Sequence, residues 1–367
     1  MAAPSHKSPA LDSVLVPRIE ELSVKNYRAL KSIRMQNLTP LTVLLGPNGS
    51  GKSTLFDVFA FLSECFTSGL RRALDKRGKL RELRTRGTEE PVVIELKYRE
   101  MPYKVGDRKT RALAYHIEIQ NGPSGPVVEH EYLQWSRGGG SGRPFRFIEF
   151  RQGKGKAATG ELPEAEEEKE DVQLESAEIL GVSTLGQFAD HPRVTALRKF
   201  ITDWYLSYLS ADSVRGVAEP GPQERLSQNG GNVANVLQYL KETRPDTLEC
   251  ILNALAKRIP RLNDVATKEM EDGRLLLQFR DGPFDEPILA RYASDGTLKM
   301  LAYLMVLHDP DIPKFIGIEE PENHLYPMLL PELAEECRQA TERSQIVVTT
   351  HSPFFVNELT PKEVWMM

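Results

Sequence analysis

The sequence predicts an α/β protein with a mostly parallel core sheet, an inserted antiparallel sheet and a helical lobe. Two observations predict the core. Residues 41–68 have the pattern of a buried strand, a Gly-rich loop and a helix, and residues 296–350 alternate between helical and strand-like patterns. A third observation predicts the antiparallel insertion, because short strand-like runs separated by Gly and Pro turns fill residues 91–150.

The same patterns divide the 367-residue chain into six parts. We expect a flexible leader (1–17), an N-terminal core part (18–90), an antiparallel sheet region (91–158), an acidic loop or disordered insert (159–183), a helical lobe with a hairpin (184–290) and a C-terminal core part (291–367). Within the helical lobe, apolar spacing predicts helices at Val194–Leu209, Val233–Glu242 and Leu248–Ile259, and a hairpin near "MEDGRLLLQF".

Composition excludes several classes of protein. The net charge of −5 gives no global attraction to nucleic acid or to an anionic membrane surface. The three cysteines, Cys65, Cys250 and Cys337, are too widely spaced for a disulfide framework or a zinc motif, which favours a reducing, cytoplasmic location. The N-terminus lacks the apolar core of a secretory signal, and no apolar run is long enough to span a bilayer, so we expect no membrane association.

The segment "GPNGSGKST" matches the phosphate-binding pattern G-x-x-x-x-G-K-[ST], and it follows a predicted buried strand and precedes a predicted helix. Glycines allow a tight loop whose backbone N–H groups surround phosphate oxygens at a helix N-terminus. Lys52 is expected to pair with the β- and γ-phosphates, and the Ser53 hydroxyl to bind Mg²⁺. The predicted ATP-binding residues are Gly46, Asn48, Gly49, Ser50, Gly51, Lys52, Ser53 and Thr54.

Two adjacent acids, Glu319 and Glu320, end the apolar stretch "FIGI". Like charges placed side by side at the end of a buried strand are costly unless a cation or a reaction uses them. A bound nucleotide with Mg²⁺ requires an acid at a neighbouring strand end. We therefore assign Glu319 to Mg²⁺ or its water, and Glu320 to polarising the water that attacks the γ-phosphate; no second metal centre is expected.

Two weaker signals follow the same logic. "SDGT", comprising Ser294, Asp295, Gly296 and Thr297, directly precedes a predicted helix and is a second candidate anion site, although an ordinary helix cap has the same appearance. His351 lies just past the predicted strand "QIVVTT". A histidine there is a candidate γ-phosphate contact, with an ordinary loop position as the alternative.

Taken in order, these segments resemble the ABC-class ATPase head of the RecF/SMC/OLD-like branch, including the predicted ATPases of antiphage defence systems. "LSVKNYRAL" is similar to the N-terminal strand and turn, "GPNGSGKST" to Walker A, "YASDGT" to the signature, "IGIEEPENHLYP" to Walker B with the D-loop, and "TTHSP" to the switch-histidine segment. The signature differs from the transporter form L-S-G-G-Q, and Glu319 stands where most of the wider class has Asp. Relatives usually continue beyond the position of Met367, which suggests that the chain stops early.

The resemblance implies further site residues. Gln187 in "STLGQFADHP" corresponds to a Q-loop glutamine and is a candidate metal ligand. Tyr27 and Arg28 are candidate nucleotide contacts, with ordinary turn packing as the alternative. Catalysis would rest on Glu320 and His351, with ATP and Mg²⁺ as cofactors.

The resemblance also implies a mechanism in which two heads sandwich ATP between Walker A of one and the signature of the other. The expected function is an ATP-hydrolysing switch that forms a homodimer and controls a separate effector, a nuclease or toxin, in antiphage defence. The first alternative is a DNA-repair ATPase of RecF type that binds DNA directly. The second is the nucleotide-binding subunit of a membrane transporter, which the S-D-G-T signature disfavours; a GTPase is disfavoured because no [NT]-K-x-D motif is found.

A basic stretch is the candidate surface for nucleic acid or an acidic partner. Its eight basic residues are Arg71, Arg72, Lys76, Arg77, Lys79, Arg81, Arg84 and Arg86. The alternative is a solvated helix-to-loop surface.

Overall fold

The computed structural model describes residues 16–100, 112–135, 144–160, 169–282 and 286–367, together with the backbone of two short strands, β5 (Lys104–Val105) and β6 (Arg108–Lys109). The predicted leader lies almost entirely outside the described residues, as does the most acidic part of the predicted insert, residues 161–168.

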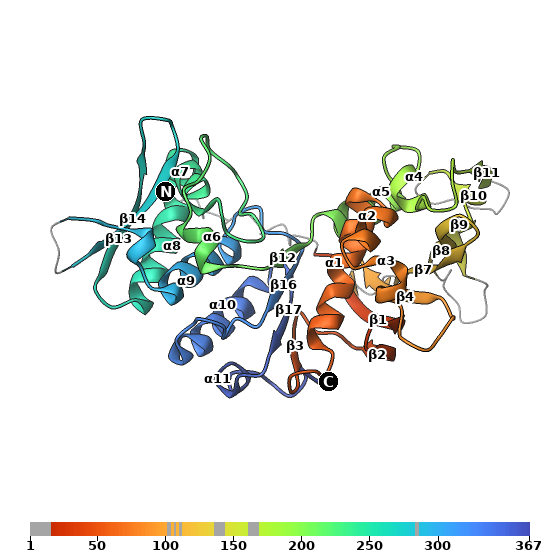
Figure 1. Cartoon of the computed structure of the whole chain (residues 1–367), viewed down its shortest axis with the longest axis horizontal. Coiled ribbons are helices and arrows are strands. Elements are labelled where there is room, and N and C mark those ends of the chain that lie inside the picture. Colours follow the sequence, from red (N-terminus) through yellow and green to blue (C-terminus); the bar gives the residue numbers. More distant parts are fainter. Residues whose placement is uncertain are drawn as a thin grey trace, which may run out of the picture.

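A five-stranded, wholly parallel sheet forms the centre of the molecule (Figure 1). Its strands, in spatial order, are β12 (Tyr205–Ser207), β16 (Phe315–Glu319), β17 (Gln345–Thr350), β3 (Leu41–Leu45) and β18 (Val364–Met366). Parallel sheets are normally covered on both faces, so their strands consist almost wholly of apolar residues, as "LTVLL" and "FIGIE" do.

Alternate residues of each central strand enter two different hydrophobic cores. Leu44, Phe315 and Val347 pack into the core that contains α1 (Lys52–Ser68). Val43, Ile316 and Val348 pack into the core on the other face, formed with α9 (Asp295–Leu307) and α10 (Leu330–Ala340). This separation follows from the two-residue period of a strand, which sends successive side chains to opposite faces.

An eight-stranded antiparallel sheet forms one lateral lobe, on the α1 side of the central sheet (Figure 1). Its strands, in spatial order, are β11 (Lys169–Gln173), β10 (Lys154–Ala158), β9 (Phe145–Arg151), β8 (Gly125–Trp135), β7 (Leu113–Gly122), β4 (Val92–Arg99), β1 (Arg18–Tyr27) and β2 (Leu30–Gln36). The helices α2 (Leu70–Asp75), α3 (Lys79–Leu83), α4 (Gly181–Leu185) and α5 (Pro192–Thr202) belong to this half of the chain.

The antiparallel sheet extends beyond the residues predicted for it, 91–158. The predicted N-terminal core part contributes β1 and β2, since β1 pairs with both β4 and β2. The predicted acidic loop contains a strand, because β11 pairs with β10 along five residues. A charged strand at a sheet edge is stable because only its backbone needs the neighbour, and its charges discourage further pairing.

The second lateral lobe contains α6 (Ala211–Arg215), α7 (Val233–Thr243) and α8 (Pro245–Arg258), followed by a small sheet of β13 (Leu262–Glu269), β14 (Leu275–Asp281) and β15 (Ile288–Leu289). The predicted hairpin is confirmed as β13–β14, and two of the three predicted helices are confirmed as α7 and α8. The third prediction, a helix over Val194–Leu209, is wrong at its end. Thr202 ends α5, and residues 205–207 form β12 because they pair with β16.

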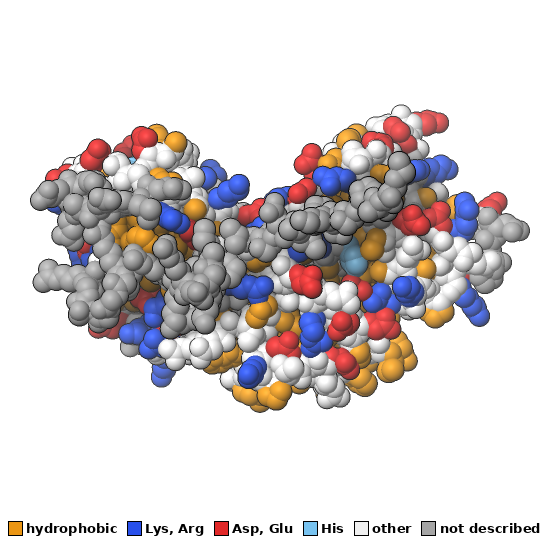
Figure 2. Space-filling view, turned by 180° about the vertical axis from the view of Figure 1, so that it is seen from behind, with side chains coloured by type: hydrophobic (Ala, Val, Ile, Leu, Met, Phe, Trp, Pro, Cys, Tyr) orange, Lys and Arg blue, Asp and Glu red, His pale blue; other side chains and the backbone are white. Residues whose placement is uncertain are grey.

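Three short elements complete the C-terminal part: η2 (Ala290–Tyr292), η3 (Pro327–Leu329) and α11 (Pro353–Val356). Seen from behind, the two lateral lobes rise on either side of a shallow saddle, and charges of both signs are interspersed over this face (Figure 2). In the part of the chain that the structure describes, no helix is both long and apolar enough to cross a membrane.

Candidate functional site

The predicted site segments meet at one edge of the central sheet, where parallel strands have their carboxyl ends. Leu45 of β3 is in register with Thr350 of β17, and Thr349 is in register with Glu319 of β16. The Gly-rich loop, the two acids and His351 therefore follow neighbouring strand ends. In open α/β sheets this edge is where ligands bind.

The loop between β3 and α1 adopts the conformation that its glycines permit. Gly49 and Gly51 have φ values of +83° and +103°, a region that side chains with a Cβ disfavour. The Lys52 ammonium is buried and donates hydrogen bonds to the carbonyl oxygens of Gly46 (2.7 Å) and Pro47 (3.1 Å). The hydroxyl of Ser50 is buried and has no hydrogen-bond partner. The loop therefore carries a cationic group and a free hydroxyl, and it leads into the N-terminus of a helix. These features together suit the binding of a polyphosphate.

Ser53 and Glu319 come together at the start of α1. The Ser53 hydroxyl hydrogen-bonds the Glu319 carboxylate, which is the contact expected of two groups that would share one cation. Burial raises the pKa of Glu319, the neighbouring charge of Glu320 raises it further, and the Ser53 hydrogen bond opposes both effects. A cation placed here would favour the ionised form, so the donor set fits Mg²⁺.

Glu320 occupies a strained backbone position directly after β16. Its φ is +41°, an uncommon value for a residue with a side chain. The backbone is held there by a hydrogen bond from its N–H to the Thr349 carbonyl oxygen (2.9 Å), and its Oε2 accepts a hydrogen bond from Asn323 (3.1 Å). Such strain persists only where surrounding contacts over-determine it, and it is concentrated at functional sites.

His351 lies beside two carboxylates, those of Glu322 and Glu320. Its Nδ1 is 3.0 Å from Oε1 of Glu322 and 4.0 Å from Oε1 of Glu320. Oε1 of Glu322 also accepts hydrogen bonds from the Thr350 hydroxyl and the His351 backbone N–H, at 2.8 and 2.7 Å. Glu322 therefore fixes the segment that presents His351, and the imidazole remains about half exposed.

The segment "SDGT" caps α9, as its sequence predicts. The Ser294 hydroxyl accepts a hydrogen bond from the Thr297 N–H at 3.2 Å. Asp295 is ion-paired with Arg215 and with His324, whose Nδ1 is 3.1 Å from its carboxylate, and the Arg215 hydrogen bond lowers the pKa of Asp295. Ser294 is exposed, whereas Asp295 is already engaged within its own chain.

A cavity of about 420 Å³ joins this helix start to the two acids. Its lining includes Asp295, Lys299, Glu319 and Glu320. Lys299 is buried, and its ammonium donates a hydrogen bond to the Asn323 carbonyl oxygen at 2.7 Å. This hydrogen bond links α9 to the turn that follows Glu320. The positions of the helix and of the turn therefore depend on each other.

Two predicted contacts do not reach the site. Gln187 donates to the Ser183 carbonyl oxygen and lines a cavity beside residues 65–72, at the C-terminal end of α1, whereas Ser53 lies at the N-terminal end. A helix of 17 residues is about 25 Å long, so Gln187 is not a metal ligand here. The Tyr27 side chain is fully buried, and its hydroxyl donates to Asp57 at 2.8 Å, which is a packing role. Burial excludes it from contact with a nucleotide.

Arg28 lies nearer to the site. Its guanidinium pairs with Asp57 at 3.0 Å, on the second turn of α1, and it is about one-third exposed. The hydrophobic neighbour Leu30 lies against Gly51 of the loop. The turn between β1 and β2 thus borders the Gly-rich loop, and a nucleotide contact by Arg28 stays a prediction.

The basic stretch is mostly neutralised by ion pairs. Arg77 is nearly buried and pairs with both Asp57 and Glu64. Other pairs join Arg71 to Glu178, Lys76 to Glu64, Arg84 to Glu89, and both Arg81 and Arg86 to Glu82. Two of the eight basic residues, Arg72 and Lys79, have no ion pair among the described residues. The stretch therefore resembles a charge network more than an open basic surface.

Sequence reasoning missed several residues of this edge. Ser207 and Tyr208 line the cavity but were predicted to be helical, and "YLSYLS" has no strict alternation that would have indicated a strand. Glu322 and Lys299 carry no local motif, since their roles depend on partners about 25 to 30 residues away. No pattern in the sequence could have identified them.

Two family models match the chain. A family model described as an AAA ATPase domain matches residues 18–207, which is more than half of the chain. A second model, described as an AAA domain, putative AbiEii toxin, Type IV TA system, matches residues 207–357. The two matches meet at β12, so together they span both halves of the site.

One solved structure shows the same fold with a TM-score above 0.5. A crystal structure of an Smc head bound to the C-terminal winged-helix domain of ScpA aligns with a TM-score of 0.53 and 13% identity, over 93% of this chain and 91% of that one. The Smc head from Thermotoga maritima (TM-score 0.43, 11% identity, 93% and 92% coverage) and one from Pyrococcus furiosus bound to the C-terminal domain of ScpA (0.47, 12%, 93% and 92%) align less closely. The chain belongs to the AAA ATPase domain family, and its fold is that of an Smc head.

Proposed function

We propose that the chain binds and hydrolyses Mg-ATP, and that ATP switches it between a separate and a dimeric state. The observation that supports this best is the convergence of the Gly-rich loop, the Ser53–Glu319 pair and the Glu320–His351 pair at three neighbouring strand ends. The Ser53–Glu319 pair has the residue types that bind Mg²⁺. The Glu320–His351 pair has the residue types that activate a water molecule and contact the γ-phosphate.

The residues of the loop bind and orient the phosphates. Lys52 exchanges its two carbonyl partners for phosphate oxygens, and the backbone N–H groups of residues 48–54 complete the cradle. Ser53 and Glu319 hold Mg²⁺, which supplies charge neutralisation when bound. Gly46, Asn48, Ser50 and Thr54 complete the binding loop.

Glu320 accepts the proton of the attacking water, and His351 contacts the γ-phosphate. The carboxylate of Glu320 faces the cavity and is oriented by Asn323. His351 is oriented through Glu322. Fixed orientation matters because phosphoryl transfer depends mainly on positioning and electrostatic stabilisation.

ATP closes a homodimer by contacting Ser294, Gly296 and Thr297 of the second chain. Ser294 is exposed at the helix start, and the flanking surface is apolar: Tyr292 is 68% exposed and Tyr326 is 66% exposed. Large exposed aromatic side chains next to a charged site are typical of a contact surface. Asp295 supports this surface from within its own chain rather than by touching the nucleotide.

The dimer controls a separate effector, which we propose to be a nuclease or toxin of an antiphage system. The match of residues 207–357 to a model described as a putative AbiEii toxin domain supports this role. Direct DNA binding of the RecF kind has less support, because most of the basic stretch is ion-paired.

Lys52→Ala tests the assignment of ATP to this loop. The variant should lose tight ATP binding and turnover while keeping its far-ultraviolet circular dichroism, since Lys52 contacts only loop carbonyls in the free protein. The control is Lys79→Ala, a lysine away from the loop, which should bind ATP as the parent does. Equal ATP affinity in the parent and Lys52→Ala would refute the proposed function.

A further inference from the structure

A second cluster of chemistry-bearing side chains lies on the antiparallel sheet, away from the Gly-rich loop. His116 and Glu118 are on β7, and His130 is on the neighbouring strand β8. Glu118 is in register with His130, and His116 lies diagonally next to it. All three side chains therefore project from the same face of the sheet.

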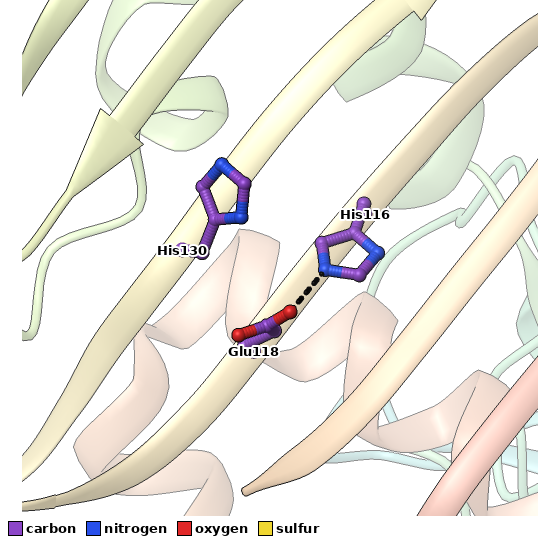
Figure 3. Close-up of side chains that lie close together, drawn as sticks. All are labelled: His116, Glu118 and His130. Carbon is purple, nitrogen blue, oxygen red and sulfur yellow. Dashed lines mark hydrogen bonds and ion pairs between the residues drawn. The ribbon is translucent and has the colours of Figure 1, made fainter.

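The three side chains offer one ligand atom each within a small space. The ligand atoms lie within 4.8 Å of one another, and Nε2 of His116 is 2.9 Å from Oε1 of Glu118. Figure 3 shows the two rings and the carboxylate gathered between β7 and β8, with one nitrogen of His130 turned toward the other two groups. In a tetrahedral zinc site the ligand atoms are about 3.3 Å apart. Side-chain rotations that move the ligand atoms by about 1 Å would bring them to this spacing.

Each histidine also has a carboxylate on its other nitrogen. Nδ1 of His116 lies 3.3 Å from Oε2 of Glu95 on β4. Nε2 of His130 lies 3.3 Å from Oε1 of Glu149 on β9, which leaves its Nδ1 for the shared space. Metal-binding histidines almost always donate their second N–H to such a group, which fixes the tautomer and the ring orientation. The carboxylates of Glu95 and Glu149 lie outside the three-residue cluster, and they too indicate that the histidines bind a metal ion.

The surroundings hold the ligands in place. His116 stacks on Tyr132 with ring centroids 4.6 Å apart and an interplanar angle of 6°, and both histidines are less than 9% exposed. Two of the surrounding carboxylates are also fixed by cations, since Glu149 pairs with Arg146 and Glu95 with Lys97.

We propose that His116, Glu118 and His130 bind a divalent transition-metal ion, with Zn²⁺ as the preferred ion. Two imidazoles and one carboxylate suit Zn²⁺ better than Mg²⁺ or Ca²⁺, which require oxygen ligands. Three protein ligands leave a coordination position for water or for an incoming group. The ion would cross-link β7 and β8 directly, and β4 and β9 through Glu95 and Glu149. The sequence analysis expected one metal centre, and this site would be a second.

Zn²⁺ binding by the purified full chain tests the proposal. Zn²⁺ is titrated without nucleotide and with Mg²⁺ in excess, so that Ser53 and Glu319 do not compete, and Co²⁺ absorption reports the geometry. The parent protein should retain one equivalent of Zn²⁺ after gel filtration. His116→Gln and His130→Gln should lose it, and Glu95→Gln should bind about 10- to 100-fold more weakly, because it removes only the orienting carboxylate.

Two variants serve as matched controls. Glu129→Gln makes the same charge change as Glu118→Gln on the same hairpin, but among the described residues the hydrogen-bond partners of the Glu129 carboxylate are Gln120 and Gln152. His308→Gln removes a histidine–carboxylate pair between the end of α9 and Glu336 of α10. Both controls should bind Zn²⁺ like the parent, whereas Glu118→Gln should not. ATP binding by every variant confirms that it is folded.

Each outcome of the Zn²⁺ titration either supports or overturns the proposed metal site. Absence of stoichiometric Zn²⁺ in the parent overturns the proposal, as does equal binding by His116→Gln and Glu129→Gln. Loss of Zn²⁺ in His308→Gln would place the metal between α9 and α10 and equally overturn the proposal. ATP binding through Lys52 uses different residues, so failure here leaves the proposed ATPase function intact.

Discussion

Oε1 of Glu320 and Nδ1 of His351 lie 4.0 Å apart at the ends of the neighbouring strands β16 and β17. The two residues are far apart in the sequence, and the parallel register of the two strands brings them together. The distance leaves room for rearrangement when a substrate binds, as is usual for catalytic groups in a free enzyme. The pair gives the clearest tests of the proposed mechanism.

Glu320→Gln keeps the shape of the side chain and removes its basicity. We expect ATP binding to survive and turnover to fall by about 10²- to 10⁴-fold, the usual contribution of a general base. The unhydrolysed ATP should hold a closed dimer, seen as a doubled mass by light scattering. Turnover at the parental rate would show that Glu320 is not the base.

Glu319→Gln is the matched variant at the adjacent acid. Because Glu319 hydrogen-bonds Ser53, we expect this change to weaken Mg²⁺-dependent ATP binding and to prevent closure of the dimer. ATP affinity with and without Mg²⁺, measured beside Glu320→Gln, checks this division of roles. Identical behaviour of the two variants would contradict it.

His351→Ala should slow hydrolysis by about 10²- to 10³-fold, the usual effect of removing one donor that stabilises the transition state. ATP affinity should change much less, because the imidazole is half exposed and its near neighbours in the described structure are the carboxylates of Glu322 and Glu320. Single-turnover rates and binding constants separate the two effects. An unfolded variant, judged by its thermal transition, would instead give His351 a structural role.

Arg77→Ala should destabilise the protein by about 2–4 kcal/mol, because it leaves Asp57 and Glu64 without their nearly buried partner. Arg81→Ala is the control: Arg81 is 93% exposed, and its loss should change the free energy of unfolding by less than about 0.5 kcal/mol. Urea unfolding measures both. Equal effects of the two substitutions would show that the Arg77 network adds no stability.

Glu131 makes stability depend on pH. Burial raises the pKa of this fully buried carboxyl to about 7, against hydrogen bonds from the Gly181 and Val182 N–H groups and the Tyr115 hydroxyl that lower it. The folded pKa exceeds the unfolded value near 4.5, so the unfolded state releases its proton first, and stability falls as pH rises from about 4.5 to 7. The shift corresponds to about 3 kcal/mol.

The measurement is the difference in unfolding free energy between the parent and Glu131→Gln across this pH range. Other groups titrate in both proteins and cancel in the difference. The parent should lose stability relative to the variant as pH rises, and a difference that is flat or has the opposite sign would show that the three hydrogen bonds keep Glu131 ionised.

The sequence by itself determined the Gly-rich loop and most of the central sheet. "GPNGSGKST" is contiguous, so the glycines, Lys52 and Ser53 are placed by local backbone geometry alone. The strands around "LTVLL", "FIGIE" and "QIVVTT" are equally readable, because a strand buried on both faces must be apolar along its whole length. These segments made the fold class predictable before any long-range contact was known.

Tertiary structure alone decided the remaining features. Residues 205–207 form a strand because they pair with β16. Gln187 lies near the C-terminal end of α1, whereas Ser53 lies at its N-terminal end, so the two residues are far apart. Packing buried Tyr27, and ion pairs neutralised most of the basic stretch. The register of β7 against β8 brought His116, Glu118 and His130 together. In a strand a His-x-Glu pattern is unremarkable by itself, and its neighbours are set by a register that depends on the packing of the whole sheet.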